Sequence, residues 1–282
     1  MEEEKKNVFY GITDVGQAES LLNQFRCDRP KDLNGAEEML DDLLDALLLP
    51  DIELTGDANA FHNFAVSITR ISNDNKDAFN IVREGLKIHS GNVDLLADAI
   101  KYGYNCGQKE YCQKCFATLN TIKKDKWTWR AFSFSIDYLR EEWADKDTDT
   151  AEDILKLVKE YQEMRPDEED AWLCEYEVYD SINQTSRGIE VLEKAIEQFR
   201  FCPKCCLRYA EIMMDRGDYE KAEPIIKKLR LNPKTGESIN LSFMFYLDGL
   251  CKMSKLMASD EYEDGDVDER EVIKVYRSFR LA

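Results

Sequence analysis

The chain has 282 residues, 43% of them hydrophobic, and its 57 acidic and 38 basic residues give a net charge of −19. This hydrophobic content excludes a disordered chain, and the negative charge disfavours direct binding of nucleic acid or of an anionic membrane. The charge favours a basic protein partner, or it serves only to keep the chain soluble. No apolar stretch reaches the length of a membrane span and the first residues lack the pattern of a secretion signal, so we expect a cytoplasmic protein.

Residues 1–12 are expected to form an N-terminal tail, and the rest of the chain is expected to form helices in pairs. Apolar residues recur at helical spacing, and turns rich in Gly, Pro and Asn separate the helices. In chain order the expected helices lie at about 13–27, 36–49, 61–68, 78–85, 93–105, 111–119, 127–139 and 150–164, then in two further pairs between 170 and 233, and finally at 237–258 and 269–279. The total is seven helix pairs, with few residues left for strands.

The same structural unit recurs along the chain. Three pairs of equivalent residues each lie 34 positions apart, namely Ala78 and Cys112, Trp172 and Cys206, and Gly188 and Ala222. A period of this length, with two amphipathic helices per unit, is typical of a stacked helix–turn–helix array. Each pair can bury only one face alone, so neighbouring pairs are expected to stack.

These units resemble tetratricopeptide repeats. Residues 217–219, Gly-Asp-Tyr, resemble the family's turn between its two helices, and Gly188 and Ala222 stand where the second helix must touch the first. Trp172 opens a first helix, and Pro166 and Pro233 end second helices near where the family places its proline. The resemblance implies an all-α fold, a right-handed α-solenoid of about seven helix pairs that forms one domain over residues 13–282. The best repeats are 92–124, 169–202 and 203–234.

The resemblance also implies that the first helices of the pairs line a concave surface to which other proteins bind. By register, the residues expected to point into this surface are Asn63, Ser67, Arg70, Lys101, Tyr104, Asn105, Leu173, Glu177, Asp180, Leu207, Glu211, Met214 and Asp215. The first half is mixed in charge and the second half is acidic. We therefore expect a basic or amphipathic partner segment along the second half, unless this is an ordinary solvated helix face. Exposed aromatic residues such as Tyr104 and Trp129 are expected to serve as anchors.

Some members of the family hold a C-terminal carboxylate with Lys, Arg and Asn side chains in the groove. The matching positions of this chain are occupied by Leu173, Glu177, Leu207 and Glu211. Because none of these side chains carries a positive charge, the sequence argues against a carboxylate-clamp co-chaperone.

The nine cysteines include two Cys-x-x-Cys pairs, Cys112/Cys115 and Cys202/Cys205. Several helix pairs separate them, and helices pack about 8–10 Å apart, so the two pairs cannot share one zinc ion. Neither pair has a nearby His to complete a site of its own. Cys202/Cys205 at a helix start also resembles a redox pair, although the surrounding fold is not the usual one. We expect reduced, buried thiols that pack in the core.

The acidic segment 260–271 resembles an EF-hand calcium loop. The positions that would supply ligands are Asp260, Asp264, Asp268 and Glu271. Tyr262 replaces one expected oxygen ligand, and the second acidic segment, 145–149, lacks the following Gly and the bidentate Glu. We therefore expect no cofactor, and calcium at 260–271 is the alternative to a solvated acidic turn.

The sequence offers little that could support catalysis. It contains no Gly-rich phosphate loop, no Ser or Cys with an identifiable His partner, and only two His residues. We therefore predict a non-enzymatic adaptor or scaffold that binds a protein partner on its acidic concave surface. Two alternatives are an acidic regulator that covers a partner's basic, nucleic-acid-binding surface, and a calcium-responsive regulator that acts through residues 260–271. The sequence does not indicate the oligomeric state.

Overall fold

The computed structural model describes residues 9, 11–143, 148–232, 241–257 and 268–281. Within these residues the chain forms fourteen α-helices, one short 3-10 helix and no β-strand, apart from an isolated bridge between Asp14 and Thr55. The helices follow one another in consecutive pairs. The prediction of an all-α solenoid of about seven helix pairs is confirmed.

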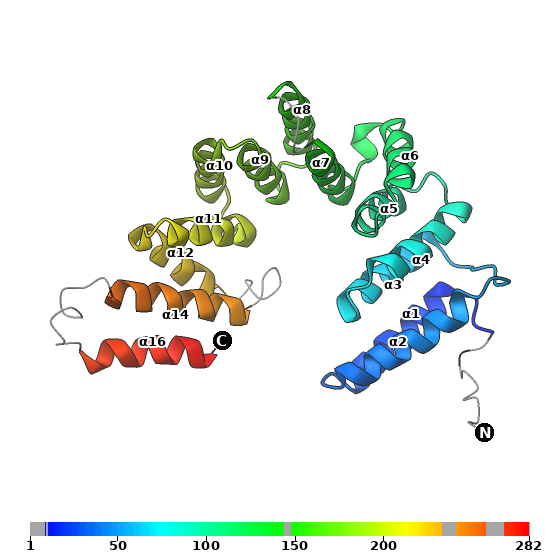
Figure 1. Ribbon diagram of the computed structural model, residues 1–282, viewed down its shortest axis with the longest axis horizontal. Helices are drawn as coiled ribbons and strands as arrows, with labels where there is room; N and C mark the ends of the chain where they lie inside the picture. Colours follow the sequence, from blue (N-terminus) through cyan, green and yellow to red (C-terminus); the bar gives the residue numbers. More distant parts are fainter. Residues whose placement is uncertain (1–8, 10, 144–147, 233–240, 258–267, 282) are drawn as a thin grey trace. The chain divides into compact units, whose positions relative to one another are not determined.

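The chain divides into two compact units, residues 1–142 and 143–282. The first unit contains α1 (Val15–Asp28), α2 (Leu33–Leu47), α3 (Ala58–Ile71), α4 (Asn75–Ile88), α5 (Val93–Asn105), α6 (Lys109–Asn120), η1 (Lys124–Lys126) and nearly all of α7 (Trp129–Trp143) (Figure 1). The second contains α8 (Thr148–Met164), α9 (Asp170–Ser181), α10 (Thr185–Gln198), α11 (Pro203–Asp215), α12 (Tyr219–Leu231), α14 (Leu241–Met257) and α16 (Glu269–Leu281). That residues 13–282 act as one domain stays a prediction.

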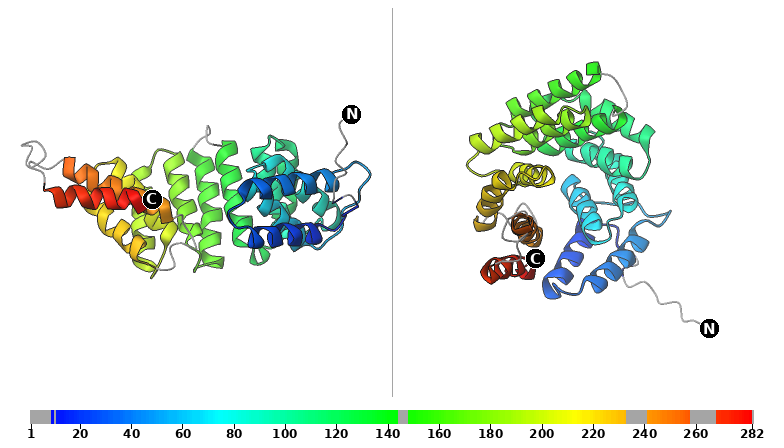
Figure 2. Two further views of the ribbon diagram at one scale, coloured as in Figure 1. Left: turned by 90° about the horizontal axis from the view of Figure 1, so that it is seen from below. Right: turned by 60° about the vertical axis from the view of Figure 1, so that its left-hand side comes forward.

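First helices of neighbouring pairs pack against each other. In the first unit α1 contacts α3 and α3 contacts α5, and in the second unit α9 contacts α11 (Figures 1 and 2). The two helices of a pair also pack closely, for example α5 with α6 and α14 with α16. This arrangement gives the first helices of each unit a shared surface, where the sequence predicted a binding site.

Short polar side chains begin the first five helices. Asp14, Asp32, Asp57, Asp74 and Asn92 each accept a hydrogen bond from a backbone N–H in the first turn of the helix that follows. These side chains satisfy N–H groups that have no partner inside the helix, which stabilises each helix start by about 1 kcal/mol.

A residue with positive φ lies in the turn between the two helices of four pairs. The φ angles are 56° at Asn73, 80° at Gly107, 58° at Asn183 and 74° at Gly217. Gly and Asn adopt this left-handed conformation at lower cost than other residues. Asn73 and Gly107 lie 34 positions apart, as do Asn183 and Gly217. The predicted turns at 73–75, 107 and 217–219 are thereby confirmed.

Small residues allow the two helices of a pair to approach closely. A Cβ atom on Gly85 would lie 2.7 Å from the ring of Phe61, and a Cβ on Gly188 would lie 2.8 Å from the ring of Tyr176. Ala222, one repeat after Gly188, is fully buried. The predicted packing role of Gly188 and Ala222 is confirmed.

Helix α7 differs from its predicted bounds. We expected Trp127 inside this helix, but it lies directly after η1, and α7 begins at Trp129. The Trp127 ring is fully buried, and its indole N–H donates to the carbonyl of Ile122 at 3.2 Å. Burial of this large ring stabilises the connection more than two further helical residues would.

Polar contacts join residues that lie about one repeat apart. The Thr128 hydroxyl donates to Asp94 at 2.7 Å, and Lys204 Nζ donates to Asp170 at 2.7 Å, each across 34 positions. One carboxylate oxygen of Glu169 accepts from the backbone N–H groups of Lys204 at 2.9 Å and Cys205 at 3.3 Å. Glu169 therefore caps the start of α11 from the neighbouring pair.

Candidate protein-binding surfaces

A hollow of about 280 Å³ lies between α5 and α7 in the first unit. Three of the predicted binding residues, Lys101, Tyr104 and Asn105, line it from α5. The remaining lining residues are Ile100, Phe134, Asp137, Tyr138, Arg140 and Glu141. A hollow of this size, with aromatic walls and charged edges, can receive one side chain of a bound segment.

Charged and aromatic groups of the hollow hold one another in place. Asp137 lies 3.5 Å from Lys101 Nζ and 3.5 Å from Arg140 Nη2. Tyr104 packs edge-on against Tyr138, with ring centroids 5.9 Å apart. The two cations are already neutralised by carboxylates, so the hollow attracts neither a strongly anionic nor a strongly cationic ligand.

A partly buried polar ladder joins three successive first helices of the same unit. It consists of His62 on α3, Asp98 on α5 and Arg130 on α7. Asp98 is only 1% exposed, and its burial raises the pKa of its carboxyl group, while His62 and Arg130 oppose this effect. A guanidinium can only donate hydrogen bonds, so Nε2 of His62 accepts from Arg130. The ring proton of His62 then lies on Nδ1, which donates a hydrogen bond to Asp98.

The sequence reasoning missed this ladder, although a signal was present. His62 and Asp98 lie 36 positions apart, and Asp98 and Arg130 lie 32 apart. Polar residues about one period apart occupy equivalent places on neighbouring first helices. The recurrence of polar residues at this spacing is therefore the signal that links the three residues.

The other predicted residues of the first half lie on α3. Asn63 and Arg70 are exposed, as expected for a binding surface. Ser67 is 5% exposed, and its hydroxyl donates to Glu19 of α1 at 3.0 Å. Ser67 therefore joins two first helices and is not available to a partner in this structure.

In the second unit, the first helices α9 and α11 carry an excess of negative charge. The carboxylates are Asp170, Glu175, Glu177, Asp180, Glu211 and Asp215, and the cations are Lys204 and Arg208. The seven predicted residues of this half are all at least partly exposed, namely Leu173, Glu177, Asp180, Leu207, Glu211, Met214 and Asp215. The acidic character predicted for these two helices agrees with their residue content, while their role in binding stays a prediction.

Apolar and charged groups alternate on these two helices. Leu173, Leu207 and Met214 are half-buried and pack against the core of the second unit. Glu211 is half-buried as well, and its burial raises the pKa of its carboxyl group, with Asp215 adding to this effect. Arg208 Nη1 lies 3.1 Å from Glu211, which opposes the shift. The surface thus combines partly desolvated carboxylates with accessible apolar side chains.

The cysteines of both Cys-x-x-Cys pairs are buried and form no disulfide. Burial raises the pKa of Cys112 to about 11 and that of Cys115 to about 12. Burial likewise raises the pKa of Cys205, and Cys202 lies 3.8 Å from the sulfur of Cys206. Protonated, buried thiols are poor nucleophiles and poor metal ligands, so these positions support a packing role.

Two of the four predicted calcium ligands, Asp260 and Asp264, lie outside the described residues. The other two are engaged locally at the start of α16, where Asp268 accepts from the backbone N–H of Arg270 at 2.9 Å and Glu271 pairs with Lys274. In the described part of the chain, no three His, Cys, Asp or Glu side chains gather closely enough to hold a metal ion. Calcium binding stays a proposal, and an unchanged melting temperature and Tyr signal on calcium addition would remove it.

No known protein family matches this sequence, and no curated protein is similar to it. Among solved structures, human IFIT1 in a dimer with m7Gppp-AAAA has a TM-score of 0.53 at 13% identity, over 88% of this chain and 55% of IFIT1. The chain has a tetratricopeptide-like fold. It spans about half the length of the IFIT1 chain that it matches.

Two bacterial proteins are also similar at lower scores. A tetratricopeptide repeat protein from Parabacteroides merdae has a TM-score of 0.48 at 14% identity, over 94% of this chain and 98% of that protein. PilF from Pseudomonas aeruginosa has a TM-score of 0.48 at 13% identity, over 79% of this chain and 94% of PilF. Within the described residues, none of the helices is both long and apolar enough to cross a membrane.

Proposed function

We propose that this protein is a non-enzymatic adaptor that binds a basic or amphipathic segment of a partner protein along α9 and α11. The observation that carries the proposal is the composition of these two helices, where six carboxylates outnumber two cations and Leu173, Leu207 and Met214 are half-buried. A segment with alternating cationic and apolar side chains would match both features.

Partial desolvation gives the carboxylates of this surface their value for binding. Burial already raises the pKa of Glu211, so its ionised form is poorly solvated before any partner arrives. A Lys or Arg of the partner that approaches Glu211 displaces little further water and interacts at a lower effective dielectric than in bulk solvent. Glu211 is therefore the residue of this surface on which affinity would depend most.

Direct binding of RNA is not the function that these surfaces favour. The structure of human IFIT1 contains m7Gppp-AAAA, and such a ligand requires unneutralised cations. On the first helices of residues 1–142, Arg70 is exposed, but Arg130 contacts His62 and lies near Asp98, while Lys101 and Arg140 both lie beside Asp137. With a net charge of −19 over the whole chain, a protein partner is the better match.

A second candidate function is a regulator that covers a basic surface of its partner by charge alone. The outer face of α2 supports it, because Glu37, Glu38, Asp41, Asp42 and Asp45 are all exposed there. Binding of this kind would collapse between low and moderate salt, whereas binding through α9 and α11 would retain its apolar part.

Affinity capture from the native cell at two salt concentrations, followed by replacement of Glu177 and Glu211 by Lys, tests the proposal. The double variant is expected to weaken capture of the partner by about tenfold or more, because two attractive contacts become repulsive. The matched control carries Glu152→Lys and Glu160→Lys on α8 of the same unit, which change the net charge equally at exposed positions. Equal capture by the two double variants would exclude α9 and α11 as the binding surface.

A further inference from the structure

Exposed apolar side chains are concentrated at the last helix pair. Of the twelve large hydrophobic residues that are exposed in the described parts of the chain, seven lie on α14 and α16. They are Phe243, Tyr246, Met257, Val272, Ile273, Tyr276 and Leu281. In an array of stacked pairs, a face of this kind is normally covered by the next pair.

Helix α16 is held in one orientation, so its outer face is a defined surface. The buried Asp248 of α14 accepts hydrogen bonds from Ser278 at 2.6 Å, and from Lys252 and Arg230 at 2.7 Å each. A Cβ on Gly249 would lie 2.8 Å from the Phe279 ring, which shows how closely the two helices approach. Figures 1 and 2 show α14 and α16 lying side by side at the end of the chain.

One seam on the outer face of α16 contains both apolar and charged residues. Glu269, Ile273, Tyr276 and Arg280 follow one another at alternating spacings of four, three and four, so they lie on one face of the helix. All four are exposed, Ile273 by 46% and Tyr276 by 65%. The seam therefore runs from an acidic end through an apolar centre to a basic end, which is the pattern of a helix that pairs with a copy of itself.

We propose that α16 packs antiparallel against α16 of a second copy of this chain. In this arrangement Ile273 lies opposite Tyr276 of the second copy, and Glu269 lies opposite Arg280 of the second copy, each contact occurring twice about the two-fold axis. A parallel arrangement would place Glu269 beside Glu269 of the second copy and Arg280 beside Arg280 of the second copy. Charge complementarity therefore selects the antiparallel dimer.

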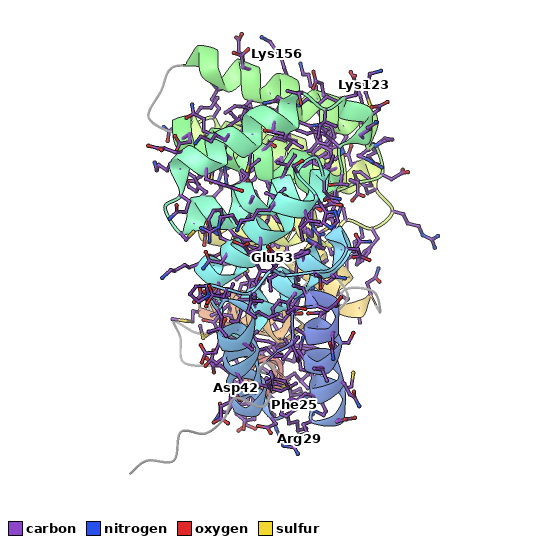
Figure 3. The ribbon with its side chains drawn as sticks, turned by 90° about the vertical axis from the view of Figure 1, so that its right-hand side faces the viewer. Phe25, Arg29, Asp42, Glu53, Lys123 and Lys156 are labelled. Carbon is purple, nitrogen blue, oxygen red and sulfur yellow. The ribbon has the colours of Figure 1, made fainter. Side chains whose placement is uncertain are left out.

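A head-to-tail contact with α2 of a second copy matches the surface less well. The outer face of α2 is acidic and includes Asp42, which is labelled in Figure 3, and this face would attract the basic end of α16. Ile273 and Tyr276 would then be buried against carboxylates, which costs free energy. Such a contact also joins different surfaces of the two copies, so it builds larger oligomers instead of a dimer wherever it does not close on itself.

Sedimentation velocity of the full chain over a range of concentrations tests the proposal. The wild-type chain is expected to form a dimer, and Ile273→Glu with Tyr276→Glu is expected to leave a monomer. The matched control is Ile88→Glu on α4, an exposed apolar residue outside the patch at 51% exposure, which should leave the dimer intact. Circular dichroism checks that all variants keep their helix content.

A charge exchange separates this dimer from other contacts. Glu269→Arg alone and Arg280→Glu alone should each weaken the dimer by about tenfold, because each creates two like-charge contacts. The double exchange should restore the wild-type dissociation constant, since every pair then regains opposite charges.

Three results would overturn the proposal. They are a wild-type chain that stays monomeric up to about 100 μM, a dimer that survives Ile273→Glu with Tyr276→Glu, and oligomers larger than a dimer that are lost when the acids of α2 are replaced. The measurement reads molecular mass, so its outcome is independent of the adaptor function proposed above.

Discussion

Replacing Gly188 by Ala is expected to destabilise the second unit, although Ala favours the helical conformation more than Gly does. Gly188 lies on α10, where the added Cβ would meet the Tyr176 ring at 2.8 Å and the Tyr176 backbone carbonyl at 3.2 Å. The ring can rotate only within a packed core, since Tyr176 is 5% exposed. The carbonyl belongs to α9 and cannot move unless the two helices separate.

The two opposing contributions can be compared. Ala in place of Gly in a helix interior stabilises by about 1 kcal/mol. Adding a methyl group to a well-packed core costs about 1–3 kcal/mol, and contact with backbone places this site near the upper value. The free energy of unfolding should therefore fall by about 1–2 kcal/mol, the difference between these contributions.

Urea denaturation followed by circular dichroism, together with hydrogen exchange of the α9 and α10 amides, measures the effect. In a stacked array, hydrogen exchange reports the loss of stability at the helices where it occurs. The urea transition of the whole chain averages that loss over several helix pairs. Gly91→Ala is the control, because its Cβ would meet nothing within 4 Å and its φ is not left-handed. That variant should be neutral or slightly more stable.

A second substitution tests whether the overlap with Tyr176 is the cause. The equivalent positions one repeat later are occupied by Ala222 and Ala210, which correspond to Gly188 and Tyr176. The chain itself therefore has Ala at both positions of this contact in the next repeat. The double variant with Tyr176→Ala and Gly188→Ala should lose less free energy of unfolding than the sum of the losses of the two single variants. A Gly188→Ala variant that is as stable as the wild type, or additive losses in the double variant, would refute the reasoning.

Three further outcomes are expected. Glu169→Ala should lower the stability of the second unit by about 1–2 kcal/mol, seen as faster hydrogen exchange at the start of α11, because it removes the cap supplied by the neighbouring pair. Burial tends to raise the pKa of Asp248, but its hydrogen bonds and the nearby cations hold the pKa below 3.8. The ionised carboxylate therefore stabilises the folded state above pH 3.8, and this stabilisation is lost as the pH falls through the pKa of the folded state. Asp248→Asn should therefore be less stable near neutral pH and should show a flatter pH dependence of the α14–α16 amides below pH 3.8. Iodoacetamide should label the exposed Cys27 first and the half-buried Cys106 next, while the buried Cys202 should react only after unfolding, as mass spectrometry would show.

Much of the fold could be predicted because one period governs it. Gly188 and Ala222 at equivalent positions indicated close helix contacts, and Asn73, Gly107 and Gly217 indicated the turns. These residues are fixed by local backbone geometry and by contacts within one pair, which a single sequence displays directly. The exception was Trp127, whose place is decided by tertiary burial and not by helical spacing.

The surfaces were harder to predict, because a side chain's role depends on the neighbouring pair. Lys101 and Tyr104 do line a hollow, but its other wall comes from α7 and was not foreseen. Ser67 has the register of an exposed residue, yet Glu19 on α1 draws it into a contact between helices. Residues this far apart in sequence show their relation only when the polar positions of each repeat are aligned.

The ladder of His62, Asp98 and Arg130 limits how the length of this protein can change during evolution. Duplication or loss of a complete repeat usually preserves the contacts of a stacked array, since each new neighbour offers an equivalent face. Loss of the α5–α6 pair would remove the Asp98 carboxylate and leave the imidazole and the guanidinium, which already contact each other, without an anion. Gains and losses of repeats should therefore occur outside residues 58–143, and this segment should be inherited as a block.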